Sequence, residues 1–204
     1  MDNLLEPSLF FHSLYQNVDG YQISFQARQK LFENSSDLTY GEIPFVSWRE
    51  IILRANPKNG GVFFDLGSGS GRVVVASHLL FNFRKSVGVE LLFELHEAAL
   101  EIKNNFEKLA TPQIKEHVAG RELHFIHSNF LNTDLRDADF IFINHILGDK
   151  KSFAQLERKL LNELKPGTKI VTTIRRLANT AFKRLGSETY KFNWGNSRAH
   201  FFEV

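Results

Sequence analysis

The sequence DLGSGSG, from Asp65 to Gly71, joins a short apolar run at residues 62–67 to a helical pattern at residues 72–81. In parallel α/β sheets, ligands bind at turns of this kind, beside the carboxyl ends of the strands. Glycine allows the backbone to turn tightly and to approach a ligand closely. The stretch therefore predicts an α/β fold with a ligand site at the end of its first strand.

The glycine spacing and two acidic residues narrow the class of ligand. The dinucleotide fingerprint G-x-G-x-x-G requires its third glycine at position 72, which is Arg72 here. Asp65 precedes the glycines, and a carboxylate attracts an ammonium group but repels phosphate. Glu90 ends the next apolar run, about 20 residues after the loop, where nucleotide-binding folds place the acid that binds the ribose. These residues predict a nucleoside cofactor with an amino-acid end.

The rest of the chain alternates between strand and helix patterns. Apolar runs at residues 85–90, 122–127, 138–144 and 168–174 predict strands, and amphipathic patterns at residues 91–109 and 153–164 predict helices. This alternation predicts a parallel sheet with helices on both faces. Residues 188–204 contain two apolar runs around Gly195-Asn196 with no helical pattern between them, which predicts an antiparallel hairpin.

The first forty residues have weaker periodicity. Asp19 is a candidate cap for a helix from about residue 21 to residue 32, and the polar run at residues 34–37 ends it. We therefore expect a small helical N-terminal extension at residues 1–38 and a ligand-binding domain at residues 39–204. Within that domain, the pattern of residues 45–55 predicts a further helix with one apolar face.

Composition excludes several classes of protein. A chain of 204 residues with 43% hydrophobic and 24% charged residues is typical of a globular domain. The absence of cysteine excludes disulfides, thiolate metal sites and cysteine nucleophiles. His124 and His127 lie on opposite faces of a predicted strand, so we expect no metal site. No apolar run approaches the ~18 residues that span a bilayer, and the N-terminus is acidic, so we expect a soluble cytoplasmic protein without membrane contact.

The charge is unevenly distributed along the chain. The net charge is +2, but from Lys151 onward eleven Lys and Arg residues stand against four Asp and Glu residues. A basic segment of this kind is typical either of a solvated surface or of a site for an acidic partner. Both alternatives remain open from the sequence.

The glycine loop and Glu90 resemble the nucleoside-binding half of class I S-adenosylmethionine-dependent methyltransferases. The stretches TYGEI (residues 39–43), SNFL (128–131) and FINHIL (142–147) further resemble the catalytic domain of the disruptor-of-telomeric-silencing type of histone lysine methyltransferase, which has no SET domain. The resemblance covers about residues 39–204. It implies a seven-stranded Rossmann-like methyltransferase sheet with a terminal antiparallel hairpin, and S-adenosyl-L-methionine as cofactor.

The resemblance also implies a role for each matching residue. Tyr40 and Glu42 would close over the methionine end of the cofactor, and Glu90 would hold the ribose. Asn144 would lie near the transferred methyl group, and Trp194 would line a lysine channel, so the implied catalytic residues are Asn144, Tyr40 and Trp194. The other implied cofactor-binding residues are Asp65, Gly67, Ser68, Gly69 and Gly71 at the methionine end, and Asn129 and Phe130 at the adenine.

Several positions depart from the pattern of that family. Asn129 replaces an aspartate, Arg72 replaces a glutamine, and His145 and Ile146 replace the second asparagine and the phenylalanine of an N-N-F motif. The departures leave the cofactor assignment intact, but they leave the methyl acceptor open. A histone or another protein is the expected acceptor.

The sequence lacks motifs that other classes of methyltransferase require for their methyl acceptors. The turn after the fourth strand contains no proline, unlike the Asn/Asp-Pro-Pro-aromatic turn of enzymes that methylate base amino groups. Cytosine-carbon methylation would require a cysteine nucleophile. We therefore expect a lysine side chain rather than a nucleic acid as methyl acceptor. A small-molecule methyltransferase and a cofactor-binding interaction module without turnover remain as alternatives.

Overall fold

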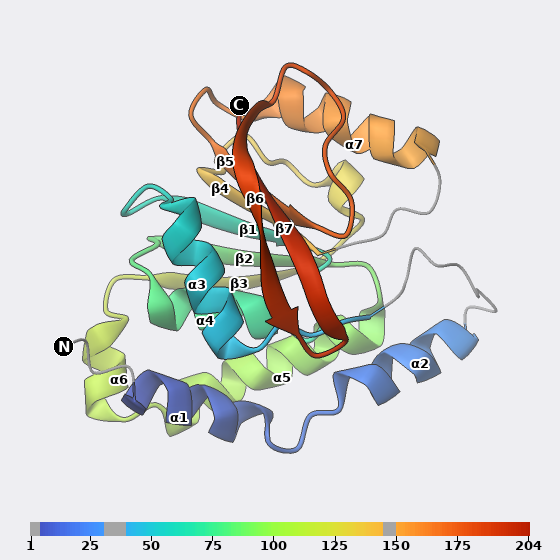
Figure 1. Cartoon of the computed structure of the whole chain (residues 1–204). Coiled ribbons are helices and arrows are strands. Elements are labelled where there is room, and N and C mark those ends of the chain that lie inside the picture. Colours follow the sequence, from blue (N-terminus) through green and yellow to red (C-terminus); the bar gives the residue numbers. More distant parts are fainter. Residues whose placement is uncertain (1–4, 31–39, 145–149) are drawn as a thin grey trace.

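The computed structural model describes residues 5–30, 40–144 and 150–204. A seven-stranded sheet in the order β3-β2-β1-β4-β5-β7-β6 forms the centre of the fold (Figure 1). The strands are β1 (Val62–Leu66), β2 (Lys85–Glu90), β3 (Glu122–His127), β4 (Phe140–Ile143), β5 (Lys169–Thr173), β6 (Lys183–Phe192) and β7 (Gly195–Glu203). The helices are α1 (Leu5–Tyr15), α2 (Gly20–Lys30), α3 (Phe45–Ala55), α4 (Arg72–Leu80), α5 (Phe93–Leu109), α6 (Pro112–His117) and α7 (Lys150–Glu163), and Phe130–Asn132 form a short 3₁₀ helix, η2.

The sheet confirms the predicted fold class. Strands β1 to β5 pair in parallel, and β7 pairs antiparallel with both β5 and β6. All five residues of β1 are buried, because this central strand is covered on both faces. Its carboxyl end therefore opens directly into the glycine loop, between the ends of β2 and β4.

Two hydrophobic clusters cover the two faces of the sheet. Alternate residues of β1 belong to different clusters: Phe63 packs with the residues of α3 and α4, whereas Phe64 packs with those of α7. Aromatic rings dominate the first cluster, in which the fully buried Trp48 lies 4.6 Å from the ring of Phe142 and 5.8 Å from that of Phe63. Most of the 20 phenylalanines therefore belong to the core, whereas Phe25 and Phe93 are exposed.

The terminal hairpin differs from the prediction in two details. Its turn lies at Asn193-Trp194 rather than at Gly195-Asn196, because Gly195 already pairs with Phe192 as the first residue of β7. Strand β6 begins at Lys183 rather than near residue 188. This edge strand is mostly exposed, and a register shift between Arg184 and Gly186 interrupts its alternation, so its first half carries no strand pattern in the sequence.

The helices near the N-terminus pack against the sheet domain. Helix α2 begins one residue earlier than expected, and Asp19 Oδ1 accepts a hydrogen bond from Gln22 N, as predicted for a cap. The sequence did not predict α1 as a separate helix, nor the short α6. Phe11 and Tyr15 of α1 are nevertheless buried in the same cluster as Trp48. Helices α1 and α2 both pack along α5 (Figure 1).

None of the helices within residues 5–30, 40–144 and 150–204 combines the length and the apolar character that a bilayer span requires.

Candidate cofactor site

The glycine loop has a backbone that only glycine adopts readily. Gly67, Gly69 and Gly71 have φ angles of 88°, 55° and 82°, all in the left-handed region. A Cβ atom on Gly69 would lie 2.5 Å from the ring of Tyr40, and one on Gly71 would lie 2.6 Å from the ring of Phe125. Conformation and crowding therefore both require glycine in the turn that leads from β1 into α4.

Asp65, on β1, carries a buried carboxylate that lacks a partner. Its side chain is almost fully buried, and Oδ1 forms no hydrogen bond to any described residue. Burial raises the pKa of Asp65 well above its usual range, and the nearby Glu90 carboxylate raises it further. Ser68 Oγ is also buried without a partner in the described chain. Two unsatisfied polar groups at the end of one strand indicate a ligand site, and the carboxylates favour a cationic group there.

Glu90 ends β2 and binds the backbone on both sides of the crevice. Its Oε2 accepts from Gly69 N at 2.7 Å, and its Oε1 accepts from Leu91 N and Leu92 N, each at 2.8 Å. Burial raises the pKa of Glu90, and these backbone hydrogen bonds oppose that shift. Glu90 therefore fixes the glycine loop itself, a role that the sequence did not reveal, and Oε2 retains capacity to accept from a hydroxyl.

Tyr40 closes over the glycine loop. Its hydroxyl donates to Glu42 Oε1 at 2.9 Å and lies 2.9 Å from Ser70 Oγ. Burial, and then the Glu42 carboxylate, raise the pKa of Tyr40 above its ordinary value, so the phenol stays protonated at neutral pH. The structure thus brings Tyr40 and Glu42, two of the implied cofactor-binding residues, together with the glycine loop.

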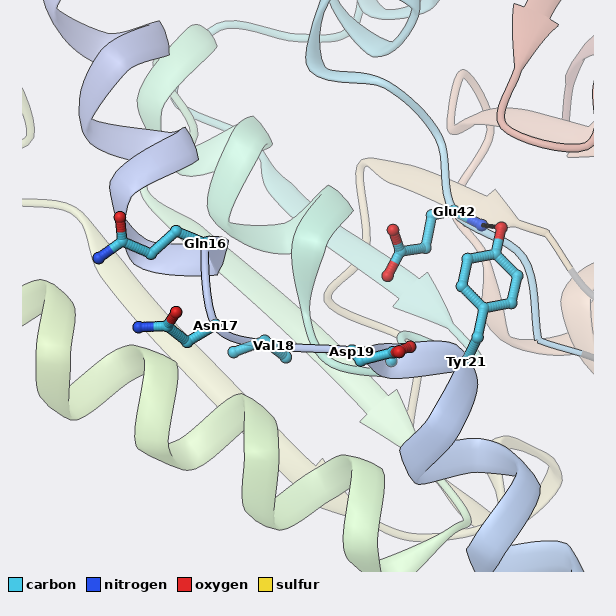
Figure 2. Close-up of a pocket in the computed structure, with 7 residues that line it drawn as sticks. Gln16, Asn17, Val18, Asp19, Tyr21 and Glu42 are labelled. Carbon is cyan, nitrogen blue, oxygen red and sulfur yellow. Dashed lines mark hydrogen bonds between the residues drawn. The ribbon is translucent and has the colours of Figure 1, made fainter.

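Glu42 links this loop to the N-terminal helices. Its backbone N–H donates to the Tyr21 hydroxyl at 3.3 Å (Figure 2). The Glu42 carboxylate is largely buried and faces a pocket of about 380 Å³ beside the turn between α1 and α2. The other residues that line this pocket are Gln16, Asn17, Val18, Asp19, Gly20 and Tyr21.

Arg72, the first residue of α4, occupies the position where the family has glutamine. Its Nε lies 3.5 Å from Glu42 Oε2, and its guanidinium lies over the rings of Tyr15, at 4.4 Å, and Phe11, at 5.5 Å. Tyr15 also donates its hydroxyl to Ser70 O at 3.3 Å. No sequence pattern pointed to Tyr15 or Tyr21, because only tertiary packing brings α1 and α2 to the glycine loop.

A second group of candidate residues lies beyond β4. Asn144 Nδ2 donates to Gly41 O at 3.2 Å, and Asn144 Oδ1 accepts from the hydroxyl of Thr173. Trp194 is 41% exposed, so it is not a core residue. A Cβ atom on Gly41 would lie 2.7 Å from the Trp194 ring. Asn144, Gly41 and Trp194 therefore form one cluster, and His145 and Ile146 lie outside the described residues.

Asn129 and Phe130, the residues implied for the adenine, follow β3. Ser128 N donates to Glu90 O at 2.9 Å, which places this segment beside the end of β2. Asn129 Oδ1 accepts from Leu131 N at 2.9 Å and caps η2, and Phe130 is buried against the sheet cluster. The structure brings both residues to the site, but it commits the Asn129 oxygen to the backbone and leaves little of the Phe130 ring exposed.

The described residues contain no group of three or more His, Asp or Glu side chains that could hold a metal ion. His124 lies 2.7 Å from Glu122 Oε2, whereas His127 contacts Leu91 O at 2.9 Å. The two histidines have separate partners, in agreement with their expected orientation on opposite faces.

The sequence is similar to those of known lysine methyltransferases. A histone-lysine N-methyltransferase, H3 lysine-79 specific, from Caenorhabditis elegans is 33% identical over 147 residues, which cover 70% of this chain and 15% of that protein. A protein-lysine N-methyltransferase from Saccharolobus islandicus is 29% identical over 136 residues, covering 64% of this chain and 75% of that protein. The chain spans less than a third of the length of the H3 lysine-79-specific relatives that it matches first, with shares of 15%, 29% and 26%.

Solved structures support the fold. An RNA methyltransferase from Salinibacter ruber in complex with S-adenosyl-L-homocysteine has a TM-score of 0.53 and 22% identity, covering 77% of this chain and 89% of that one. The rRNA methyltransferase aviRa from Streptomyces viridochromogenes has a TM-score of 0.59 and 16% identity, covering 86% and 92%. At these identities the likeness extends to the sheet and its helices only. The family model described as "Histone methylation protein DOT1" matches residues 21–192, and the chain therefore belongs to that family.

Proposed function

We propose that the chain is an S-adenosylmethionine-dependent protein-lysine N-methyltransferase. The observation that carries the proposal is the buried Asp65 carboxylate, whose Oδ1 lacks a partner among the described residues, beside Glu90 and beneath the glycine loop. A buried, unpaired carboxylate favours a cationic ligand group. An amino-acid ammonium satisfies that demand, whereas a diphosphate would be repelled.

The residues of the crevice fit this cofactor. Asp65 would receive the ammonium group, and Glu42 lies at the same end, already paired with Arg72. The Arg72 guanidinium would offset a ligand carboxylate there. Glu90 would accept from the ribose through Oε2, and Asn129 and Phe130 would border the adenine. When bound, S-adenosylmethionine supplies an electrophilic methyl group on a sulfonium.

Asn144 and Trp194 are the residues that we assign to the acceptor side. Asn144 is held by Gly41 and Thr173, so its side chain has a fixed orientation between the cofactor crevice and β5. A lysine must lose its proton before it can attack, and its reference pKa is about 10.4. An apolar wall formed by Trp194 and the adjacent Phe192 ring, 4.8 Å away, would favour the neutral amine. Alignment by such residues can contribute about 7–11 kcal/mol to lowering a barrier.

The names of the relatives support a protein acceptor. The Caenorhabditis elegans relative is named for lysine 79 of histone H3, and the Saccharolobus islandicus relative for protein lysine in general. We propose a lysine in a histone or another protein as acceptor, and an acidic partner for the basic C-terminal third of the chain.

Methyl-labelled S-adenosylmethionine tests the proposed reaction directly. The protein is incubated with the labelled cofactor and with nucleosomes, free histones or whole-cell lysate, and the labelled fraction is hydrolysed to amino acids. We expect label in methyl-lysine, and we expect its loss in Asp65→Asn. Label only in nucleic acid or in small molecules would contradict the assignment.

A further inference from the structure

Three arginines of the C-terminal third lack a partner in the part of the chain that the structure describes. The side chains of Arg176, Arg184 and Arg198 are exposed and form neither an ion pair nor a hydrogen bond there. Of the neighbouring cations, Lys183 and Lys169 share a single carboxylate, that of Glu203, which lies 3.0 Å from Lys183 Nζ. The positive charge that remains on the β6–β7 hairpin therefore comes mainly from these arginines, with Lys191 as a further exposed cation.

The three arginines converge on one place although they come from three segments. Arg198, His200 and Phe202 lie two residues apart along β7, so their side chains share one face of the strand. Phe202 is the cross-strand partner of Arg184, which therefore lies on the same face. Burial, followed by the positive charges of Arg176, Arg198 and Arg184, lowers the pKa of His200. His200 thus lies within the field of all three guanidinium groups, and they form one cluster, which we call the arginine cluster (Arg176, Arg184 and Arg198).

A groove of about 630 Å³ borders the arginine cluster. The segment 176–184 lines it and contributes Arg176, Lys183 and Arg184. This segment is held in place, because Glu157 of α7 accepts from Asn179 N at 3.2 Å and the Phe182 side chain is buried. The groove is therefore a defined surface rather than a loose loop.

The cluster borders the acceptor side of the proposed active site. Ala199 pairs with Thr173, the residue whose hydroxyl binds Asn144. Arg198 is the next residue of β7 toward Trp194 and projects from the opposite face of the sheet from Ala199, and Arg176 follows the end of β5 by three residues. The arginine cluster therefore lies at the same edge of the sheet as Asn144 and Trp194, and a substrate chain bound to the cluster reaches them around that edge.

We infer that the arginine cluster docks an acidic segment that flanks the acceptor lysine of a protein substrate; this inference rests on the proposed function. Guanidinium groups bind carboxylates through two parallel hydrogen bonds, and three unpaired arginines, two of which line the groove, match a short run of Glu or Asp. A nucleic acid fits less well, because Phe182, Tyr190 and Phe192 are buried, and Trp194, at 41% exposed, is the one aromatic side chain of the terminal hairpin, residues 183–203, on which a base could stack.

The test compares two labelled peptides, one with a lysine among glutamates and one with glutamines in place of the glutamates. The triple variant Arg176→Gln/Arg184→Gln/Arg198→Gln removes the cluster. Lys108→Gln/Lys115→Gln/Lys151→Gln removes the same charge from α5, α6 and α7, where these lysines are exposed. Fluorescence anisotropy measures peptide binding at low and high salt, and calorimetry with S-adenosylmethionine checks the cofactor site.

Binding of the acidic peptide should weaken about ten-fold in the arginine variant and stay near the original value in the lysine variant, with cofactor affinity unchanged in both. Equal weakening in the two variants, or an arginine variant that still prefers the acidic peptide, would overturn the inference. Single-stranded RNA that displaces the peptide and binds more tightly would also overturn it, in favour of nucleic acid. Because binding is measured without turnover, an absence of methyl transfer would count against the proposed function and not against the docking surface.

Discussion

The crevice at β1 and β2 and the Asn144–Trp194 cluster lie at the same edge of the sheet, but different groups hold them. In the crevice, the backbone provides the contacts: Glu90 accepts hydrogen bonds from three backbone N–H groups, and the three glycines of the loop have left-handed φ angles. In the Asn144–Trp194 cluster, by contrast, side chains provide contacts: Asn144 binds the Thr173 hydroxyl and the Gly41 carbonyl, and Trp194 is 41% exposed. Because the backbone forms the cofactor crevice, the crevice can keep its shape when the side chains that face the methyl acceptor are replaced.

Replacement of Glu90 should have the largest effect, because Glu90 holds the backbone of the cofactor crevice. Glu90→Ala removes the acceptor of three backbone N–H groups and leaves buried donors unsatisfied. We expect the free energy of unfolding to fall by about 3–5 kcal/mol, together with a loss of cofactor affinity. Urea denaturation and calorimetry measure both quantities. Normal stability with weakened cofactor binding would contradict the structural role that we assign to Glu90.

Replacement of Asp65 should separate stability from binding. Asp65→Asn should weaken S-adenosylmethionine binding about 10- to 100-fold, because a charge-assisted hydrogen bond is lost. The same variant should be more stable than the original protein at neutral pH, because it removes a buried, unpaired carboxylate.

The pH dependence of this gain has a definite sign. The pKa of Asp65 is raised in the folded chain, so the folded state binds more protons than the unfolded state between the two pKa values. The stability of the original protein therefore falls as the pH rises through that window. The advantage of Asp65→Asn should be largest above the raised pKa and should vanish below about pH 4, the unfolded value. Thermal unfolding across this range measures it, and a gain at low pH alone would contradict the assignment.

Replacement of Asn144 should affect the acceptor side alone. Asn144→Ala should lower the rate of methyl transfer about 100-fold through loss of alignment, while cofactor affinity changes by less than about three-fold. Single-turnover kinetics and calorimetry separate the two effects. Parallel losses of rate and affinity would place Asn144 in the cofactor site instead.

The smallest effect should come from the link between α2 and the Tyr40–Glu42 loop. Tyr21→Phe removes the hydroxyl that accepts from Glu42 N and should weaken cofactor binding by about 0.5–1.5 kcal/mol. Tyr190→Phe is the matched control, because the Tyr190 hydroxyl binds Glu188 on the terminal hairpin, away from the crevice. If cofactor affinity fell equally in both variants, the contact between Tyr21 and Glu42 would have no specific role in cofactor binding.

The sequence revealed the parts of the fold that local patterns determine. The glycine loop, the ends of β1 and β2 and the parallel pairing of the strands follow from glycine spacing, apolar runs and the alternation of strand and helix patterns, and the structure confirms them. The early start of β6 had no signal, because an exposed edge strand with a register shift shows no alternation. The contacts of Tyr15 and Tyr21 with the crevice, and the convergence of the arginine cluster on His200, depend on tertiary packing and strand register, which a single sequence does not display.

A crystal structure of the protein with S-adenosylmethionine would test the central claim most directly. The ligand ammonium should lie within hydrogen-bond distance of Asp65 Oδ1, and the ribose hydroxyls should lie at Glu90. A ligand bound elsewhere, or one that leaves Asp65 Oδ1 without a partner, would contradict the account.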